Sequence, residues 1–402
     1  MRINLDRRNL LVAGGVGLVM PGLPLAQNAA PQPAAPAPAD TSGVPNSEKR
    51  INVVTLRDLE AEAQKVMAPF GFAYVSGGAG DEWTLRENLA AFNRWVINPD
   101  FMNGAGSADT TTTLLGVKLS YPVITAPVGN QGSVHALADL PNVKGTNAAG
   151  TLYCVSSVSQ LSCEDIAAAT DGPKWFQLYI PRDRGFAREM LQRVKAAGYT
   201  ALIVTADVDV TSNRERSMRL QGAALPNLKM GNAPRTEAGR AGNAMDMKGD
   251  MSWSDVEFCR KESGLPVLVK SILSPANAKQ ALSAGCSGIW LSNHGGRQLD
   301  NSPSALTTLP QVAATVKGRA PIIIDGGIFR GQDVFRAIAL GASAVAIGRP
   351  TLYGSALGGA QGVQTVHNHL KAELSMVMRL AGTPTIKSIA RKHVARAENA
   401  SA

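Results

Sequence analysis

The sequence predicts an α/β fold: a (β/α)8 barrel with an N-terminal helical extension and a long loop after the fourth strand. From about residue 120 one unit recurs, a short β-branched apolar run, a polar or glycine-marked turn and a helical stretch. Most starts lie 22 to 32 residues apart, the size of a βαβ unit, and the runs are apolar throughout, as in strands buried on both faces. The eight expected strands are Pro122–Val128, Thr151–Ser157, Lys174–Ile180, Ala201–Asp207, Pro266–Ile272, Gly288–Asn293, Ala320–Gly326 and Ala344–Arg349.

One interval is longer than the others. Between Asp207 and Pro266 lies a Gly-, Asn- and Met-rich stretch from about Gly222 to Met251, which we expect to form a long loop over the site. A doubly wound open sheet is the alternative fold. It is less favoured because the nucleotide fingerprint G-x-G-x-x-G is missing after the first strand, where the chain reads Val-Gly-Asn-Gln-Gly.

The composition indicates a globular protein with anionic ligands. Of 402 residues, 45% are hydrophobic, and the formal net charge is +9. Residues 1–26 contribute +2, so the remainder is still basic. The Lys and Arg residues are scattered and not interleaved with aromatic residues, which disfavours nucleic-acid binding. Anionic small molecules account for the charge equally well.

The first residues resemble an export signal of the twin-arginine type. Arg7 and Arg8 precede an apolar, Gly-rich run of 11 residues from Leu10 to Met20, and a small-residue cleavage site ends at Ala26. A membrane anchor would need about 20 apolar residues. We therefore expect a signal peptide over residues 1–26 and a periplasmic location, by a route that carries proteins already folded around a cofactor.

The rest of the chain is expected to form a tether and one domain. Residues 27–47 are rich in Ala and Pro and lack apolar periodicity, which predicts a flexible tether, and residues 48–402 form the barrel domain. The cysteines, Cys154, Cys163, Cys259 and Cys286, form no CxxC and have no His at metal spacing, so no metal site is expected. Buried free thiols are the simpler interpretation, although an oxidising compartment would permit a bridge.

Polar residues gather at the ends of the expected strands, which is where barrel enzymes carry their chemistry. The most informative segment is Leu291–Asp300. In it His294 follows a strand, two glycines permit close backbone approach, and Arg297 comes next, which offers a base beside an anion clamp. A lone histidine is more often structural, and we interpret the remaining histidines in that way: His135, His367, His369 and His393.

From about Leu56 to Ala395 the sequence resembles the FMN-dependent 2-hydroxy acid oxidase family, which includes glycolate oxidase, lactate oxidase, lactate monooxygenase and mandelate dehydrogenase. The motifs match in order and fall on expected strand ends. They are Phe72–Thr84, Trp175–Tyr179, Thr205–Asp207, Asn213–Arg214, Val269–Lys270, the Leu291–Asp300 segment, Asp325–Gly327 and Gly348–Pro350.

The resemblance implies a catalytic role for His294 as the base, with Asp207 stabilising its protonated form. It leaves open whether the substrate hydrogen leaves as hydride or proton. Arg214 and Arg297 would bind the substrate carboxylate, because a guanidinium matches a carboxylate fork. The two remaining substrate contacts would be hydrogen bonds from Tyr74 and Tyr179.

The resemblance also implies an FMN site. Lys270 would lie beside the N1 and O2 edge of the flavin and favour the anionic reduced ring. The ring would contact Pro127, Gly129, Ser156, Gln177 and Thr205. The phosphate would sit after strands seven and eight, held by Asp325, Gly326, Gly327, Gly348 and Arg349, with Arg330 beside it.

Three positions depart from the family pattern. Val158 stands where many members have Tyr or Trp, and Gly129 where short-chain oxidases usually have alanine. We expect both changes to admit a bulkier substrate side chain. Phe329 replaces a second arginine near the phosphate, so one ion pair is missing.

The predicted function is FMN-dependent oxidation of an (S)-2-hydroxy acid, lactate-like or bulkier, to the 2-oxo acid. Electrons would pass to oxygen or another carrier, and no cytochrome domain is expected, because there is no C-x-x-C-H. The alternative is an exported flavin- or hydroxy-acid-binding protein without turnover. The family resemblance further implies a homo-oligomer, commonly a tetramer.

Overall fold

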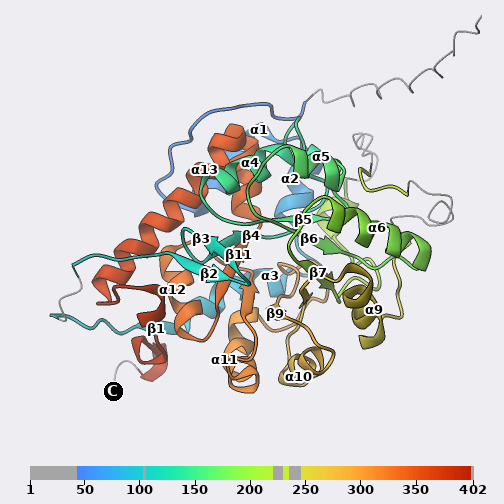
Figure 1. Ribbon diagram of the computed structural model, residues 1–402. Coiled ribbons are helices and arrows are strands. Elements are labelled where there is room, and N and C mark those ends of the chain that lie inside the picture. Colours follow the sequence, from blue (N-terminus) through green and yellow to red (C-terminus); the bar gives the residue numbers. More distant parts are fainter. Residues whose placement is uncertain (1–42, 103–105, 221–229, 235–245, 400–402) are drawn as a thin grey trace, which may run out of the picture. The chain divides into compact units, whose positions relative to one another are not determined.

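Eight parallel strands close into a barrel in the computed structural model, which describes residues 43–102, 106–220, 230–234 and 246–399 (Figure 1). The strand order is β10-β11-β4-β5-β6-β7-β8-β9, so the chain runs once around the barrel and β11 pairs with β4 to close it. The strands are β4 (Val123–Thr125), β5 (Tyr153–Ser156), β6 (Lys174–Leu178), β7 (Leu202–Thr205), β8 (Val267–Lys270), β9 (Gly288–Leu291), β10 (Ile322–Asp325) and β11 (Ala344–Ile347).

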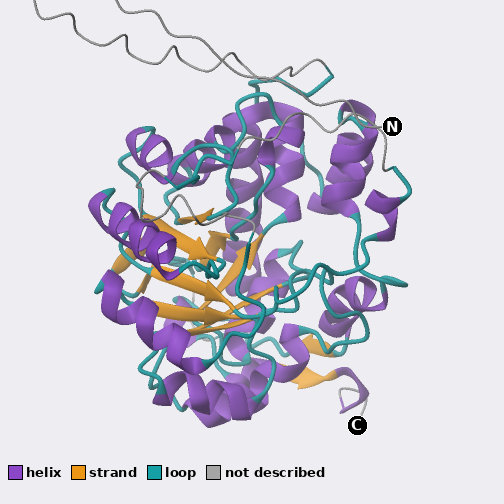
Figure 2. Ribbon diagram, turned by 90° about the vertical axis from the view of Figure 1, so that its right-hand side faces the viewer, coloured by secondary structure: helices purple, strands orange, loops and turns teal. Residues whose placement is uncertain are grey.

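The predicted (β/α)8 barrel is therefore confirmed, and each strand lies inside its predicted range. The strands are shorter than predicted because the residues that follow them turn into loops at the carboxyl ends. Helices cover the barrel on the outside (Figure 2). They are α4 (Leu140–Ala148), α5 (Cys163–Ala168), α6 (Arg184–Ala196), α9 (Trp253–Ser263), α10 (Pro275–Ser283), α11 (Ala305–Val316), α12 (Gly331–Ala339) and α13 (Arg349–Leu380), with a short helix α7 (Glu215–Met218) after β7.

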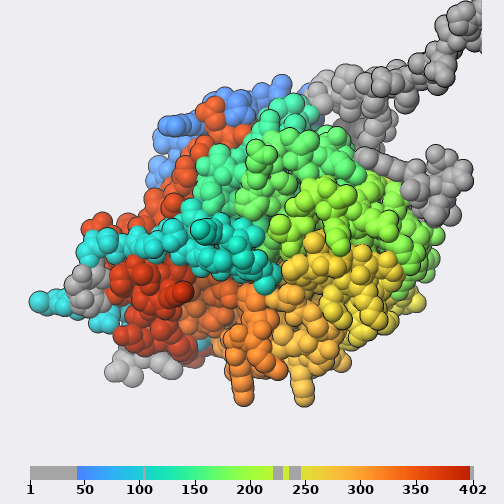
Figure 3. All heavy atoms as spheres, viewed as in Figure 1, coloured from blue at the N-terminus to red at the C-terminus, as the bar shows by residue number. Residues whose placement is uncertain are grey.

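The strand side chains alternate between two cores. One core fills the barrel and includes Trp175, Leu268 and Trp290, whereas their strand neighbours pack outward against the helices. The hairpin of β2 (Thr112–Leu114) and β3 (Val117–Leu119) packs against the inner core. In Figure 3 the cyan atoms of this segment lie over the middle of the face that Figure 1 shows.

The N-terminal helical extension brings further side chains to the barrel. It consists of η1 (Leu56–Asp58), α1 (Leu59–Val66), α2 (Pro69–Ser76) and α3 (Trp83–Asn93), and the following strand β1 (Trp95–Ile97) pairs with β12 (Val394–Arg396) near the C-terminus. Two short 3-10 helices, η3 (Ile386–Ser388) and η4 (Arg391–His393), precede β12, while η2 (Gln131–Ser133) follows β4 and η5 (Ala397–Asn399) follows β12.

The expected signal peptide and most of the expected tether, residues 1–42, lie outside the described residues. The last residues of the tether contact the domain: the carbonyl of Pro45 accepts a hydrogen bond from the Ala136 amide (2.9 Å). Just beyond, the Glu48 carboxylate accepts the amides of Ala360 and Gln361 at a kink in α13. All four cysteines are buried and none forms a disulfide, as the simpler interpretation of the sequence predicted.

The long loop after β7 falls partly outside the described residues, which omit 221–229 and 235–245. Its described parts are fixed to the barrel. The side chain of Asn232, 1% exposed, accepts a hydrogen bond from the Cys163 amide (2.8 Å) and donates one to the Ser157 carbonyl (3.2 Å). Further along, Met247 forms an antiparallel bridge with Pro181. The loop thus reaches over the carboxyl ends of β5 and β6.

A buried carboxyl group, that of Asp139, binds the backbone of the loop after β5. Asp139, directly before α4, is fully buried, and its Oδ2 accepts the amides of Gln160 (3.2 Å) and Leu161 (3.4 Å). Its Oδ1 has no hydrogen-bond partner among the described residues. Burial raises the pKa of Asp139 to about 6, although hydrogen bonds from the loop oppose the shift. The carboxyl group of Asp139 is therefore expected to change its charge between acidic and neutral pH.

We predict that Asp139→Asn changes the pH dependence of stability, because the amide keeps an acceptor and cannot ionise. The folded pKa, about 6, lies above the ordinary 3.8, so the contribution of Asp139 to folding is fully present below pH 3.8 and is lost as the pH rises through about 6. The loss should be about 3 kcal/mol. Melting curves from acid to neutral pH test this. As the pH rises, the melting temperature of the variant should increase relative to that of the wild type. A constant difference would contradict the assignment.

Candidate active site

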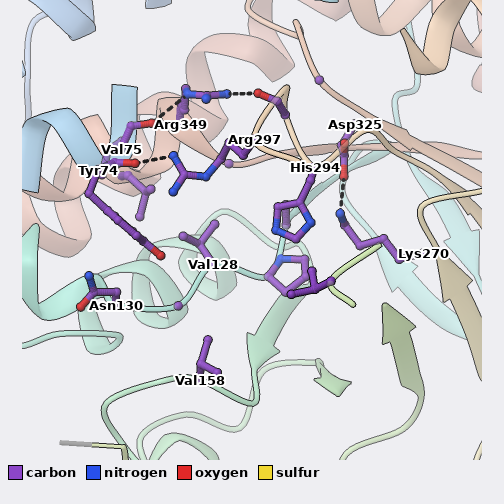
Figure 4. A pocket seen from close by; sticks show the side chains of 18 of the residues that line it. Tyr74, Val75, Val128, Asn130, Val158, Lys270, His294, Arg297, Asp325 and Arg349 are labelled. Atoms are coloured by element: carbon purple, nitrogen blue, oxygen red, sulfur yellow. Dashed lines mark hydrogen bonds and ion pairs between the residues drawn. The ribbon is translucent and has the colours of Figure 1, made fainter. Parts of the chain in front are cut away.

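A cavity of about 670 Å3 opens at the carboxyl ends of the strands, within the size range of small-molecule sites. Its lining comes from the loops after the strands, from α2 and from the described parts of the long loop. Figure 4 shows its centre, where His294 lies between Arg297 and the pair of Lys270 and Asp325, all of which line the pocket. The predicted concentration of polar residues at the strand ends is thus present around one pocket.

His294 is held in a backbone conformation that few residues other than glycine adopt. Its φ is 59°, in the left-handed region. The amide of His294 donates to Ser292 Oγ (2.9 Å), and the ring Nδ1 lies 3.0 Å from Asp207 Oδ1. These two contacts hold the backbone and the ring, so Nε2 faces the pocket. The hydroxyl of Tyr179 lies 3.4 Å from Nε2, and the two rings are stacked.

The charge states of this pair suit a base. Burial lowers the pKa of His294, although Asp207 opposes the shift. Burial opposes ionisation of Asp207, but the charge and hydrogen bond of His294 outweigh it and lower the pKa of Asp207 to about 2. At neutral pH the carboxylate is ionised and the ring is neutral, with Nδ1–H toward Asp207. Nε2 then carries a lone pair and can accept a proton.

Arg297 is a partly buried cation without an acidic partner among the described residues. Its Nη1 donates to the carbonyls of Tyr74 and Gly77 (3.0 Å for Gly77), and its guanidinium lies 4.7 Å from the centre of the Tyr74 ring. Burial lowers its pKa to about 10, so it keeps its charge at neutral pH. Arg214 also lines the pocket, but it donates to Gln298 Oε1 (2.8 Å). A partly buried guanidinium without an acidic partner fits a carboxylate ligand.

Lys270, at the end of β8, belongs to a buried network. Its Nζ donates to Ser292 Oγ (2.7 Å) and lies 3.4 Å from Asp325 Oδ2. Asp325 also accepts hydrogen bonds from Ser292 Oγ (2.7 Å) and from Trp290 Nε1 (3.0 Å). The side chain of Asp325 thus pairs with Lys270, whereas the family resemblance implied only a contact between Asp325 and the phosphate.

Ser292 is a site residue that the sequence analysis missed. Its hydroxyl accepts from the His294 amide and from Lys270, and it donates to Asp325. It therefore links the base to the lysine. The signal was available, because a serine stands between an apolar strand and His294 and is fully buried here. A buried hydroxyl at a strand end needs partners, and these are the charged groups of the site.

Glycine residues line the end of the pocket where the phosphate is expected, so that end presents mainly backbone groups. Gly326 and Gly327 have φ values of 93° and 80°, and a Cβ at Gly327 would clash with the Asn88 carbonyl, so this turn requires glycine. Gly348 precedes the first turn of α13, and all three glycines line the pocket. Amides of a glycine turn and a helix N-terminus suit a phosphate group.

The two arginines expected near the phosphate are engaged elsewhere. Arg349 lines the pocket and is buried, and its guanidinium donates to the carbonyls of Val75, Gly77 and Gly295, each at 2.9 Å. The assignment of Arg330 is corrected: it is not among the lining residues, because its guanidinium turns away to pair with Glu373 (2.8 Å).

The residues expected around a flavin ring fall into two groups. Pro127 and Gly129 line the pocket. Ser156, Gln177 and Thr205 are buried at the ends of β5, β6 and β7 and are not among the lining residues. They form a chain in which Ser156 Oγ donates to Gln177 Oε1 (3.1 Å) and Gln177 Nε2 to Thr205 Oγ1 (3.0 Å).

The structure corrects one expectation about pocket size. A Cβ at Gly129 would overlap Cγ2 of Val158, so the space left by the glycine is filled by the valine and not by a ligand. The two departures from the family pattern are complementary. Val158 itself lines the pocket, so any enlargement depends on its small side chain.

Comparisons with known proteins agree with this site. The model of the FMN-dependent dehydrogenase family matches residues 63–396. The chain is 41% identical to the L-lactate oxidase of Streptococcus iniae over 350 residues, 86% of each protein. It is 37% identical to the peroxisomal (S)-2-hydroxyacid oxidase GLO3 of Arabidopsis thaliana, covering 86% of this chain and 97% of that one.

Solved structures give the same result. A crystal structure of a lactate oxidase from Pediococcus acidilactici superposes with a TM-score of 0.82 at 38% identity, covering 86% of this chain and 95% of that one. A mandelate oxidase with (S)-2-phenylpropionate has a TM-score of 0.79 at 34% identity, with 86% and 98% covered. The chain therefore belongs to the FMN-dependent dehydrogenase family, is an enzyme related to 2-hydroxy acid oxidases, and has FMN as its cofactor.

Proposed function

We propose that this enzyme oxidises an (S)-2-hydroxy acid, lactate-like or bulkier, to the 2-oxo acid. The observation that carries the proposal is geometric: the Asp207 carboxylate holds Nδ1 of His294 (3.0 Å) so that Nε2 faces the same pocket that Arg297 lines, and Arg297 has no acidic partner among the described residues. FMN, when bound, supplies the acceptor for the two electrons that leave the substrate. The names of the relatives, lactate, (S)-2-hydroxyacid and mandelate oxidases, support this substrate class.

In this proposal, different residues of the pocket bind the substrate and transfer the proton. Arg297, with Arg214, binds the carboxylate and so fixes which face of C2 is presented. Nε2 of His294 takes a proton from the substrate, and the ionised Asp207 stabilises the imidazolium that forms. The same arrangement serves removal of the C2 hydrogen as hydride, with the hydroxyl proton going to His294, and removal of that hydrogen as a proton.

The fit of FMN follows from the chain's own groups. The ammonium of Lys270 would favour a negatively charged reduced flavin, and Asp325 and Ser292 hold it in position. The amides of the Gly326–Gly327 turn and the first turn of α13 would hold the phosphate. Phe329, an apolar side chain, lines this end, so backbone amides carry more of the phosphate binding.

The reaction is tested by mixing the purified holoenzyme anaerobically with lactate, 2-hydroxyoctanoate and mandelate and following flavin absorbance. Bleaching by an (S)-acid and not by its (R)-enantiomer is the expected result, and readmission of oxygen then tests oxygen as the acceptor. Retention of FMN without bleaching by any acid would favour the alternative, a flavin- or hydroxy-acid-binding protein without turnover.

Export is proposed from the sequence, since residues 1–26 lie outside the described residues. Among the described residues, no helix has the length and apolar content to cross a bilayer. Mass spectrometry of the mature N-terminus in the periplasmic fraction tests cleavage after Ala26, and retention of Met1 in the cytoplasm would contradict it. The tetramer implied by the family resemblance also stays a prediction, which light scattering of the purified enzyme would test.

We predict that His294→Ala keeps the flavin spectrum and slows flavin reduction by substrate roughly a hundredfold or more, because the base is lost. In wild type, kcat/KM should fall as the pH drops through the pKa of His294, which burial holds below 6.5, since protonation occupies Nε2. Stopped-flow reduction across the pH range measures both. Unchanged reduction in the variant, or a constant kcat/KM down to pH 4, would remove His294 from this role.

We predict that Lys270→Met lowers the reduction potential of the bound flavin, because a positive charge near the ring is lost. A charge contact worth about 1 to 4 kcal/mol corresponds to tens of millivolts for a two-electron couple. Lys174→Met is the matched control: this buried lysine donates to the carbonyls of Thr170 and Gly172 at the amino end of β6. Redox titration of the wild type and both variants measures the flavin potentials. A Lys270→Met potential equal to those of the wild type and Lys174→Met would refute the assignment of Lys270.

A further inference from the structure

We propose that the described parts of the long loop after β7 complete a subsite for an extended apolar side chain, so that the preferred 2-hydroxy acids carry a side chain larger than the methyl group of lactate. This inference rests on the proposed function and specifies its substrate class. The subsite consists of Val158, Met230 and Met247, all of which line the pocket; Val208 and Val210 also line it, although Val210 is 76% exposed.

Hydrogen bonds of Gly231 and Asn232 form the first anchor, by which the loop is attached near Val158. The amide of Gly231 donates to the Ser159 carbonyl (3.0 Å), and the next residue, Asn232, bonds to both ends of the loop after β5. A Cβ at Gly231 would overlap the backbone of Leu161, so this close approach requires glycine. Met230 is therefore fixed at the residues that follow β5, on which Val158 lies.

The second anchor fixes Met247 at the end of β6. Besides the bridge between Met247 and Pro181, the Arg182 amide donates to the Asp246 carbonyl and the Lys248 amide to the Ile180 carbonyl, each at 2.9 Å. The chain on both sides of Met247 is thus hydrogen-bonded to the residues after β6. Met247 is therefore held at the end of β6, and Val158 follows the neighbouring strand β5.

These anchors lie next to the reaction centre. The Ser157 amide donates to the Gln177 carbonyl (2.8 Å) and the Tyr179 amide to Ser157 Oγ (3.1 Å), so the loops after β5 and β6 run side by side. Tyr179 is the residue whose hydroxyl approaches His294 Nε2. In Figure 4 Val158 lies below His294 and Arg297 above it. With its carboxylate at Arg297, a substrate would direct its side chain toward the apolar residues.

Two polar side chains of the lining are engaged with the protein: the amide oxygen of Gln160 accepts a hydrogen bond from the Gly132 amide, and Asp246 pairs with Arg182 (3.2 Å). Asn130, Asp209 and Thr211 also line the pocket, and Oδ1 of Asn130 has no hydrogen-bond partner among the described residues. Valine and methionine supply the apolar contact surface, and the methionine side chain adapts to ligands of different shape. Each buried methylene contributes about 0.8 kcal/mol, so affinity should rise about fourfold per methylene until the subsite is filled.

The subsite is tested by binding, independently of turnover. Butyrate, hexanoate and octanoate lack the 2-hydroxyl group and cannot be oxidised at C2, so their dissociation constants can be measured on the holoenzyme from changes in flavin absorbance. We expect the dissociation constants to fall about fourfold per methylene along the series. Equal constants, or weaker binding of the longer acids, would overturn the subsite.

Anaerobic flavin reduction separates this result from the proposed function. 2-Hydroxyoctanoate should give a higher second-order rate constant for reduction than lactate. If lactate is the better substrate, the inference is wrong and the proposed function stands. If the longer carboxylates bind more tightly but no 2-hydroxy acid bleaches the flavin, the subsite is retained and the proposed function is wrong.

Variants assign the effect to named residues. Met230→Gln and Met247→Gln keep the side-chain length but introduce an amide, and each should lower the rate ratio of 2-hydroxyoctanoate to lactate about tenfold. Val158→Tyr fills the subsite and should shift preference in the same direction. Met376→Gln, in the exposed part of α13, is the matched control and should leave the ratio unchanged. A ratio that none of the three pocket variants changes would overturn the assignment.

Discussion

The pairing of β11 with β4 is the constraint on which the site depends. It closes the barrel, with Val345 opposite Val123 and Ile347 opposite Thr125. Closure brings the glycine turn and helix N-terminus after the last two strands next to the loop after the first, and it sets all eight carboxyl ends around one opening. No short stretch of the chain contains the site, because its residues come from segments separated by up to about 270 residues.

Two cations of the site, Lys270 and Arg297, differ in whether a carboxylate neutralises their charge. Lys270 has a carboxylate partner in Asp325, and Ser292 connects the pair to the backbone of His294. Arg297 donates to backbone carbonyl groups and lies against the Tyr74 ring, and among the described residues no carboxylate pairs with it. Burying a cation in this way is costly unless an anion compensates it. This unpaired charge is the reason for proposing that the substrate carboxylate binds at Arg297.

The sequence predicted most of the fold, because eight apolar runs at regular spacing have few arrangements other than a parallel barrel. It also predicted that His294 and Arg297 lie at one pocket and that Asp207 contacts the His294 ring, because motif and strand end coincide there, while the roles of these residues stay predictions. The partner of a side chain was harder to predict: Arg330 turns to Glu373, and its sequence position between a glycine turn and a helix gave no sign of that. The complementarity of Gly129 and Val158 likewise depends on two loops meeting in space.

The central claim is that this pocket removes two electrons from C2 of a 2-hydroxy acid. The most direct measurement is an anaerobic chemical-quench experiment in which the 2-oxo acid formed is quantified against the FMN reduced, using substrate deuterated at C2. The account predicts equal amounts of oxo acid and reduced flavin, and slower formation from the deuterated acid if cleavage of the C2–hydrogen bond limits the rate. Flavin bleaching without a matching amount of 2-oxo acid would contradict it.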